Sequence, residues 1–397
     1  RLHRADMKDS ASIKENVNGE RLKNKVFQSR DLCLRALDTN SLCAKNVRRN
    51  VEKMQSKELI IGDMCARIPV IQGGMGVGVS LSRLAGTVAA CGGIGIISTA
   101  QIGYREPDFQ KHPIEANLRT IGKEIQKARE IADGGIVGVN IMVATQKYEE
   151  YVKAAVAAGA DCIISGAGLP LTLPELTAGS RTKIAPIVSG TKALSVITKY
   201  WQKKYARKPD FIVAEGPLAG GHLGFSGEEL DAYTPEGYEQ ELRKMIAQAK
   251  EMQVPFIVAG GVYTAEDKNH YMEMGADGVQ LGTRFVTTEE CDASDAYKQA
   301  YIRAKKEDIV IVKSPVGMPG RAIHNTFLDR VANGERFMRG CRQCIKTCNP
   351  ATAPYCITEA LVNAVEGRLD EGLIFCGSNA YRADRIERVA DIMEEFA

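Results

Sequence analysis

The sequence lacks the features that mark a membrane, an exported or a nucleic-acid-binding protein. Its 397 residues contain no apolar run of about 18 residues, so we expect no transmembrane helix. Residues 1–30 lack the apolar core of a signal peptide, so we expect a cytoplasmic protein. The net charge is only +3 and no segment interleaves basic with aromatic residues, so nucleic acid is not an expected partner.

The N-terminal segment also lacks a strong pattern. Residues 1–53 are polar, rich in charge and without a clear amphipathic period, and we treat them as an extension. Met54 is a candidate natural start. With 44% hydrophobic residues, the chain can bury the core of one large domain and an appendage. We therefore predict a barrel domain over residues 54–330 and a cysteine-rich, helical segment over residues 331–397.

From Pro69 onward, short β-branched runs alternate with helical stretches, which is typical of βαβ units and a parallel sheet. We predict eight strands, at residues 70–72, 94–98, 136–141, 162–165, 185–189, 211–214, 256–259 and 278–281. The predicted helices cover residues 81–90, 114–131, 148–158, 191–205, 235–251 and 264–274. This order predicts a TIM (β/α)8 barrel. A Rossmann fold is the alternative, but no G-x-G-x-x-G follows the first strand.

Glycine-rich segments follow several of the predicted strands, at the end of a barrel where active sites are built. They include residues 72–76, 166–170 and 215–224. Two further glycine turns, at residues 260–261 and 282–283, follow the last two strands, where such barrels usually hold a phosphate. Backbone with few side chains is what a wide planar ligand requires for close approach.

Six motifs in this order carry a family resemblance: IPVIQGGMG, GVN, SGAGLP, AEGPLAGGHLG, VAGGV and ADGVQLGTRF. Together they resemble the nitronate monooxygenase family, formerly called 2-nitropropane dioxygenases, which shares its FMN barrel with enoyl-acyl carrier protein reductase II. The likeness covers roughly residues 65–330. It implies an FMN-dependent oxidoreductase.

The resemblance also implies where the cofactor binds. The residues expected along the flavin ring are Gln72, Gly73, Gly74 and Met75, with Asn140 and Gly168 near its pyrimidine side. Those expected toward the ribityl chain and phosphate are Gly221, Gly260, Gly261, Gln280, Gly282 and Thr283. For any single glycine, ordinary turn chemistry is the simpler explanation.

His222 is the candidate catalytic residue, and the chain has only five histidines. It lies in the glycine-rich segment expected at the barrel mouth, in the AGGH context that the resemblance assigns to a catalytic histidine. An imidazole there can take the α-proton of a nitroalkane, or orient nitronate oxygens or an acyl carbonyl over the flavin N5. A lone loop histidine is otherwise more often solvated or structural. Glu215, at a strand end, either contacts substrate or caps a turn.

The chain has eleven cysteines, and four of them fall within residues 341–356. Cys341, Cys344 and Cys348 form a C-x2-C-x3-C motif that Cys356 follows. Thiolates at these separations can converge on a metal or a cluster. The arrangement is similar to the [4Fe–4S] site of the dienoyl-CoA reductase family, with a shorter final spacer. Zinc held by four thiolates and a set of unligated thiols are the alternatives.

The sequence predicts an irregular segment over residues 374–382, followed by an amphipathic helix that reaches Ala397. The segment either folds over the barrel mouth as a lid or packs as an ordinary helix.

These features leave three functions open. The first is oxidation of nitronates or nitroalkanes with dioxygen. The second is NAD(P)H-dependent reduction of an enoyl thioester, with an acyl carrier protein or an electron carrier as partner. An iron–sulfur centre favours this second function, because a flavin reoxidised by dioxygen needs no such centre. The third is a non-catalytic electron-transfer module. A barrel of the IMP dehydrogenase type requires a nucleophilic cysteine at the mouth, and none is well placed. A homodimer is one candidate assembly.

Overall fold

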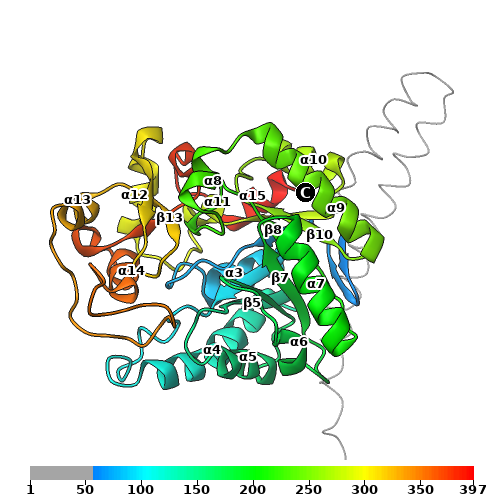
Figure 1. Ribbon diagram of the computed structural model, residues 1–397, viewed down its shortest axis with the longest axis horizontal. Helices are drawn as coiled ribbons and strands as arrows, with labels where there is room; N and C mark the ends of the chain where they lie inside the picture. The colour runs from blue at the N-terminus through cyan, green and yellow to red at the C-terminus, as the bar shows by residue number, and fades with distance from the viewer. Residues whose placement is uncertain (1–56) are drawn as a thin grey trace, which may run out of the picture. The chain divides into compact units, whose positions relative to one another are not determined.

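Eight parallel strands close into a barrel in the computed structural model of the protein, which describes residues 57–397 (Figure 1). The strand order around the barrel is β10-β11-β3-β4-β5-β6-β7-β8. The strands are β3 (Val70–Gln72), β4 (Ile94–Ser98), β5 (Ile136–Met142), β6 (Cys162–Gly166), β7 (Lys183–Val188), β8 (Ile212–Glu215), β10 (Phe256–Ala259) and β11 (Gly278–Leu281). The predicted TIM barrel is confirmed.

The strands form because their residues are apolar on both faces. In β10, Ile257 and Ala259 belong to a core cluster inside the barrel, whereas Phe256 and Val258 pack outward with the helices. Side chains of a strand alternate between its two faces, so a strand with a filled interior on one side and helices on the other is buried throughout. This double burial explains why short apolar runs identified the strands in the sequence.

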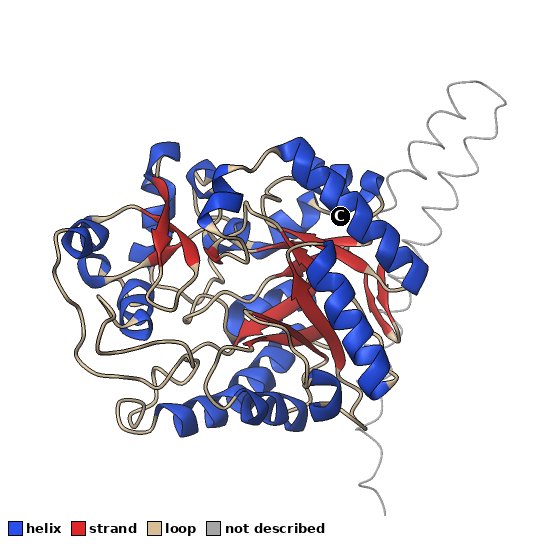
Figure 2. Ribbon diagram, in the orientation of Figure 1, coloured by secondary structure: helices blue, strands red, loops and turns tan. Residues whose placement is uncertain are grey.

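The helices between the strands cover the outer face of the barrel (Figure 2). They are α3 (Ser82–Ala90), α4 (Pro113–Ala132), α5 (Tyr148–Ala157), α6 (Leu173–Leu176), α7 (Thr191–Tyr205), α9 (Pro235–Met252) and α10 (Ala265–Met274). In α4, Ala116, Ile121, Ile125 and Ala128 are fully buried, so one stripe of this helix faces the strands. The link after β6 contains only the short α6, and no helix was predicted there.

A hairpin not predicted from the sequence closes the far end of the barrel. It consists of β1 (Leu59–Ile61) and β2 (Met64–Ala66). Leu59, Ile61 and Ala66 join the inner cluster that includes Ile94, the first residue of β4. The hairpin therefore plugs the amino-terminal end of the barrel, opposite the end where active sites of this fold are built.

A second, antiparallel sheet was also not predicted. Its strands are β12 (Ile309–Lys313), β13 (Pro319–Ile323), β14 (Ile374–Phe375) and β9 (Gly221–His222), and β13 pairs with the other three. The sheet joins the loop after β8 to the C-terminal part of the chain. The remaining helices are α8 (Gly227–Asp231), α11 (Thr283–Val286), α12 (Asp295–Arg303), α13 (Thr326–Ala332), α14 (Ile357–Val365) and α15 (Val389–Glu395).

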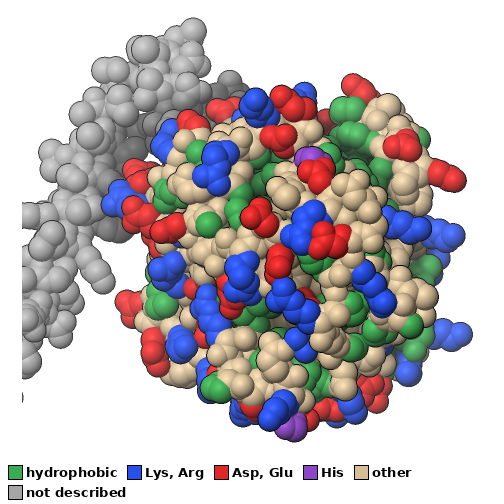
Figure 3. All heavy atoms as spheres, turned by 90° about the vertical axis from the view of Figure 1, so that its left-hand side faces the viewer, with side chains coloured by type: hydrophobic (Ala, Val, Ile, Leu, Met, Phe, Trp, Pro, Cys, Tyr) green, Lys and Arg blue, Asp and Glu red, His purple; other side chains and the backbone are tan. Residues whose placement is uncertain are grey.

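The predictions for the two ends of the chain remain untested by the structure. The extension at residues 1–53 and the candidate start Met54 lie outside the described residues. The boundary at residues 330–331 stays a prediction. None of the helices within residues 57–397 is long and apolar enough to cross a membrane. On the face shown in Figure 3, basic and acidic side chains of the described residues lie interspersed.

Candidate active site

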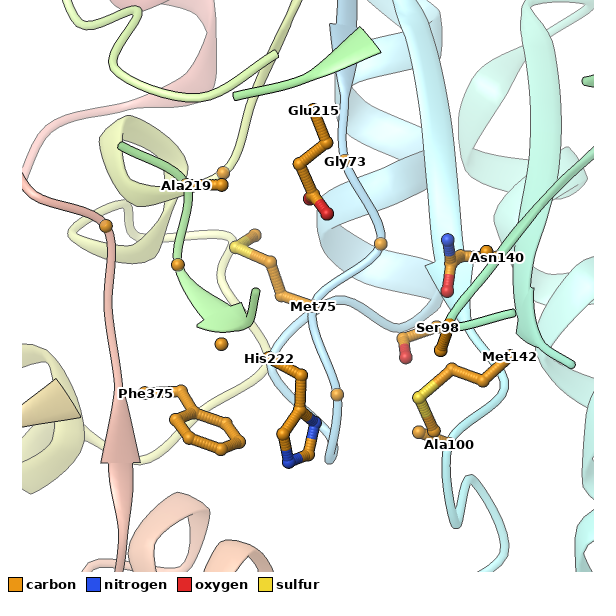
Figure 4. Close-up of a pocket in the computed structure, with 18 of the residues that line it drawn as sticks. Gly73, Met75, Ser98, Ala100, Asn140, Met142, Glu215, Ala219, His222 and Phe375 are labelled. Carbon is orange, nitrogen blue, oxygen red and sulfur yellow. The ribbon is translucent and has the colours of Figure 1, made fainter. Parts of the chain in front are cut away.

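A cavity of about 460 Å³ lies at the carboxyl ends of the barrel strands (Figure 4). Its walls come from the loops that follow the strands, from β9 and from the segment after β14. Met75 comes from the loop after β3, Ser98 ends β4, and Asn140 and Met142 come from the end of β5. The site therefore draws on residues from the whole circumference of the barrel.

The structure brings the predicted cofactor-binding residues together around this cavity, with one exception. The lining residues that the sequence predicted are Gly73, Gly74, Met75, Asn140, Gly168, Gly221, Gly260, Gly261, Gln280, Gly282 and Thr283, together with His222.

Gln72 is the exception. Its side chain is fully buried and does not line the cavity. Its Nε2 donates to the carbonyl oxygen of Ile96 at 3.1 Å, and its Oε1 accepts from the amide of Ile96 at 3.3 Å. The side chain thus ties β3 to β4 and does not face the cavity, and contact of Gln72 with a flavin stays a prediction.

The glycine turn after β10 requires glycine for its backbone. Gly260 and Gly261 have φ angles of 91° and 88°, a region that other residues enter only with strain. A Cβ at Gly260 would lie 3.0 Å from the amide nitrogen of Ala219. The turn can therefore present bare backbone to a ligand, and it cannot accept a side chain without adjustment.

The C-terminal segment after β14 covers the two glycine turns. The amide of Gly377 donates to Thr283 Oγ1 at 3.0 Å, and Asn379 Nδ2 donates to the carbonyl oxygen of Gly261 at 2.7 Å. Phe375 and Ser378 line the cavity as well. Of the two roles considered for this segment, the structure thus favours a cover at the barrel mouth.

Two buried polar atoms in the cavity point to a ligand. Gln280 Oε1 and Ser378 Oγ have no hydrogen-bond partner among the described residues. Buried polar atoms are normally paired, and an unpaired one costs about 1–3 kcal/mol. Gln280 lies at the end of β11 and Ser378 lies in the segment that covers the turns. Together with the bare glycine backbone, these atoms fit a flavin, whose ribityl hydroxyls and phosphate oxygens can donate and accept there.

His222 is held in place by two contacts. Its Nε2 lies 2.7 Å from Ser314 Oγ, and its ring packs edge to face against Phe375 with centroids 4.9 Å apart. Figure 4 shows the two rings beside each other, with Asn140 and Met142 across the cavity. Burial lowers the pKa of His222 to about 4. The imidazole is therefore neutral at physiological pH, since burial disfavours its charged form.

The partner of His222 also bears on which ring nitrogen carries the proton. Ser314 Oγ accepts from the amide of Val316 at 3.4 Å. Ser314 Oγ can still donate its own proton to Nε2 of His222. In that arrangement Nδ1 carries the single proton of the neutral ring and can donate it to a substrate oxygen.

Glu215 ends β8, and its carboxyl group points into the same cavity (Figure 4). Burial raises its pKa to about 7. Of the two roles considered from the sequence, contact with a ligand fits this position. The carboxyl group is uncharged below about pH 7 and negatively charged above it.

Some residues of the site could not be found by reading the sequence. Ser314 lies 92 positions from His222, and no local motif marks it. Phe375 and Ser378 lie in a segment whose only signal was its place before the last helix. The other histidines described do not line this cavity: His270 pairs with Glu239 and His324 pairs with Asp329 at exposed positions.

A second cavity, of about 330 Å³, is lined by Cys341, Cys344, Cys348 and Cys356. Within residues 57–397, no three histidine, cysteine or acidic side chains come together closely enough to hold a metal ion. Zinc bound by four thiolates requires convergence on one point. The cluster, the zinc ion and the unligated thiols considered for these cysteines therefore all stay predictions.

The comparisons with known proteins agree with this geometry. A model of the nitronate monooxygenase family matches residues 57–397. A probable nitronate monooxygenase of Staphylococcus saprophyticus is 35% identical over 123 residues, which are 31% of this chain and 34% of that protein. One from Staphylococcus aureus strain Newman is 32% identical over 126 residues, 32% of this chain and 35% of that protein. The chain thus matches about a third of the length of these curated relatives.

Solved structures share the fold. FabK from Thermotoga maritima superposes with a TM-score of 0.65 at 25% identity, covering 83% of this chain and 92% of that chain. A nitroalkane oxidase from Streptomyces ansochromogenes superposes with a TM-score of 0.62 at 18% identity, covering 83% and 94%.

Proposed function

Because the chain belongs to the nitronate monooxygenase family, we propose that it is a flavin-dependent oxidoreductase that oxidises nitronates with dioxygen. The observation that carries the proposal is a neutral histidine, His222, fixed by Ser314 in a cavity walled by glycine backbone. The coarse activity follows from the family. The substrate and the identity of the flavin are our inference.

We take the flavin to be FMN. Bound FMN supplies the two-electron acceptor. The backbone at Gly260, Gly261 and Gly282, with Thr283 and Ser378, surrounds its phosphate in this proposal, and Gln280 accepts from a ribityl hydroxyl. The C-terminal segment hydrogen-bonds to Gly261 and Thr283 and so covers these turns. That cover favours FMN, which ends in a phosphate, over the longer FAD.

His222 acts in this proposal as a hydrogen-bond donor rather than as a strong base. A base with a pKa of about 4 is poorly matched to removing a carbon-bound proton near neutral pH. A nitronate has already lost that proton. Donation from Nδ1 to one nitronate oxygen orients the substrate carbon toward the flavin ring and stabilises its negative charge. The preferred substrate is therefore the nitronate and not its parent nitroalkane.

The test compares a primary alkyl nitronate with its parent nitroalkane. We expect oxygen consumption with the nitronate at least about 100-fold faster than with the nitroalkane, a ratio in the range that general-base catalysis supplies. Under anaerobic conditions, the nitronate should bleach the flavin bands. Equal rates for the two compounds would show that the protein removes the carbon-bound proton itself. No bleaching by either compound would contradict the proposed reaction.

A second candidate is NAD(P)H-dependent reduction of an enoyl thioester, in which Nδ1 of His222 donates to the thioester carbonyl. One observation favours it: the four-cysteine cavity shares Cys344, Ile345 and Ile357 with the wall of the main cavity. A second redox centre there has no evident use when dioxygen reoxidises the flavin. Anaerobic consumption of NAD(P)H with an enoyl thioester would reject the oxygenase and make an acyl carrier protein or an electron carrier the expected partner.

A further inference from the structure

Four cysteines from two separate segments face one cavity beside the active site. Cys341, Cys344 and Cys348 lie in the loop after α13, and Cys356 is the N-cap residue of α14. The cavity they line has a volume of about 330 Å³. No disulfide joins them, since all four are free thiols.

The way the thiols are spaced selects among their possible ligands. A single zinc ion needs four sulfurs at about 2.3 Å from one point, which takes far less room than a cavity of about 330 Å³. An iron–sulfur cluster takes one thiolate at each iron, so it needs thiols distributed around a volume. We propose that Cys341, Cys344, Cys348 and Cys356 are the ligands of an iron–sulfur cluster next to the flavin cavity.

The cysteine loop is fixed to the barrel by backbone contacts. The amide of Gln146 donates to the carbonyl oxygen of Cys344 at 3.0 Å, and the amide of Lys346 donates to that of Ala144 at 2.9 Å. Both contacts attach the loop to the segment that follows β5. The thiols are thus held in position by the fold itself, as a preformed ligand set requires.

The other end of the loop is fixed as well. The amide of Cys356 donates to the carbonyl oxygen of Phe337 at 2.8 Å, and the amide of Phe337 donates to that of Pro354 at 2.9 Å. The guanidinium of Arg336 donates to the carbonyl oxygens of Pro350 and Ala351 at 2.7 and 3.0 Å. These bonds close the loop between Cys348 and Cys356.

The surroundings suit a group with negative charge. Cys356 is the N-cap residue of α14, a helix of nine residues, so the positive end of the helix dipole lies beside it. The amide of Gln343 donates to the sulfur of Cys341 at 3.4 Å. Arg342 also lines the cavity. Hydrogen bonds to ligand sulfurs are a common means of tuning such clusters.

The position suggests a role in electron transfer. Because Cys344, Ile345 and Ile357 line both cavities, a cluster here is the immediate neighbour of the flavin site. Each passage through a cluster moves one electron. Two passages from a reduced one-electron carrier protein supply the two electrons that reduce a flavin, with two protons taken from solvent. A cluster that delivers electrons to the flavin favours the second candidate reaction, reduction of an enoyl thioester, so the cluster proposal does not depend on nitronate being the substrate.

The test is the metal content of the full-length protein purified without oxygen. We expect roughly four irons and four acid-labile sulfides per chain, and a paramagnetic signal after reduction with dithionite. Cys341→Ser should lose most of the iron, because it removes one ligand at an exposed position. Cys65→Ser is the matched control, since Cys65 is also exposed but lies in β2 at the far end of the barrel. It should keep its iron.

Flavin content and thermal unfolding, measured on both variants, establish that each is folded; if Cys341→Ser fails to fold, Cys348→Ser replaces it. Three results would overturn the proposal. They are protein without iron even after incubation with ferrous iron and sulfide, stoichiometric zinc in place of iron, and iron that is lost equally in Cys65→Ser and Cys341→Ser. The flavin bands are read separately, so loss of the cluster is distinguishable from failure of the proposed oxidoreductase.

Discussion

At the scale of single residues, the behaviour of His222 follows from its neighbours. An exposed histidine titrates near neutral pH, whereas burial holds this one neutral down to a pKa of about 4. Ser314 fixes its ring through Nε2 at 2.7 Å. The sequence identified the histidine through its glycine-rich context. It could not identify its protonation state, which depends on contacts with residues far along the chain.

Replacing His222 tests its role directly. We expect His222→Ala to lower kcat/KM for a nitronate by about 10–100-fold, because it removes one hydrogen bond to a charged group, worth about 1.5–3 kcal/mol. His270→Ala is the control, because His270 is exposed and pairs with Glu239. Steady-state oxygen consumption measures both. If His222→Ala left every rate unchanged, a non-catalytic electron-transfer module would be the better description.

Glu215 should control the pH dependence. Its pKa of about 7 means that the carboxyl group is neutral below pH 7 and becomes negatively charged as the pH rises. A negative charge in the cavity repels an anionic nitronate, so kcat/KM should fall as the pH rises through about 7. Glu215→Gln stays neutral and should keep a flat profile from about pH 6 to pH 8.

A pH-rate profile of both proteins, with preformed nitronate, decides this point. The same pKa predicts a stability effect. A carboxyl whose pKa is raised on folding stabilises the fold fully below its unfolded value of 4.5, and this contribution is lost as the pH rises through 7. If the inflection of kcat/KM near pH 7 persisted in Glu215→Gln, a group other than Glu215 would be responsible for it.

At the scale of elements, the barrel strands could be predicted because each is buried on two faces. The runs at β3, β4, β10 and β11 were predicted with the residues that the structure shows. The two-residue strands β9 and β14 have no periodicity to detect. They exist because β13 offers them backbone partners across long separations in the chain.

The glycine turn after β10 gives a prediction about cofactor binding. Gly260→Ala places a Cβ at a φ of 91°, a strain on the order of 1–3 kcal/mol, and crowds the turn against Ala219. We expect the dissociation constant for FMN to rise by at least about 10-fold. The control is Gly227→Ala, where a Cβ meets nothing within 4 Å. Fluorescence titration of flavin-free protein measures both constants, and equal values would contradict the assignment of the turn.

The segment after β14, which covers the glycine turns, gives a second prediction about cofactor binding. Ser378 Oγ has no partner within the described residues, so Ser378→Ala should not lower the stability of the flavin-free protein. If the hydroxyl donates to the phosphate, the variant loses about 1.5–3 kcal/mol of binding, or about 10–100-fold in affinity for FMN. Ser180→Ala, whose hydroxyl donates to Thr177 at 2.8 Å away from the cavity, is the control. Unchanged affinity in Ser378→Ala would exclude this contact.

At the scale of the whole molecule, the C-terminal part completes the barrel. In α15, Val389, Ile392 and Met393 share a core cluster with Val70 of β3 and Leu84 of α3. Arg284, directly after the second glycine turn, pairs with Glu387 and, at 3.0 Å, with Glu395. The motifs recognised in the sequence ended near residue 330, whereas the family model extends to residue 397. Contacts made through packing leave no short motif, so sequence reading could only name alternatives for the last segment.

A flavin seated at the carboxyl end of this barrel is the central feature of the proposed enzyme. The absorption spectrum of the purified protein, with the released cofactor identified by mass, tests that claim most directly. We predict flavin bands and an equimolar amount of FMN. A colourless protein whose addition leaves the spectrum and fluorescence of free FMN unchanged would contradict it.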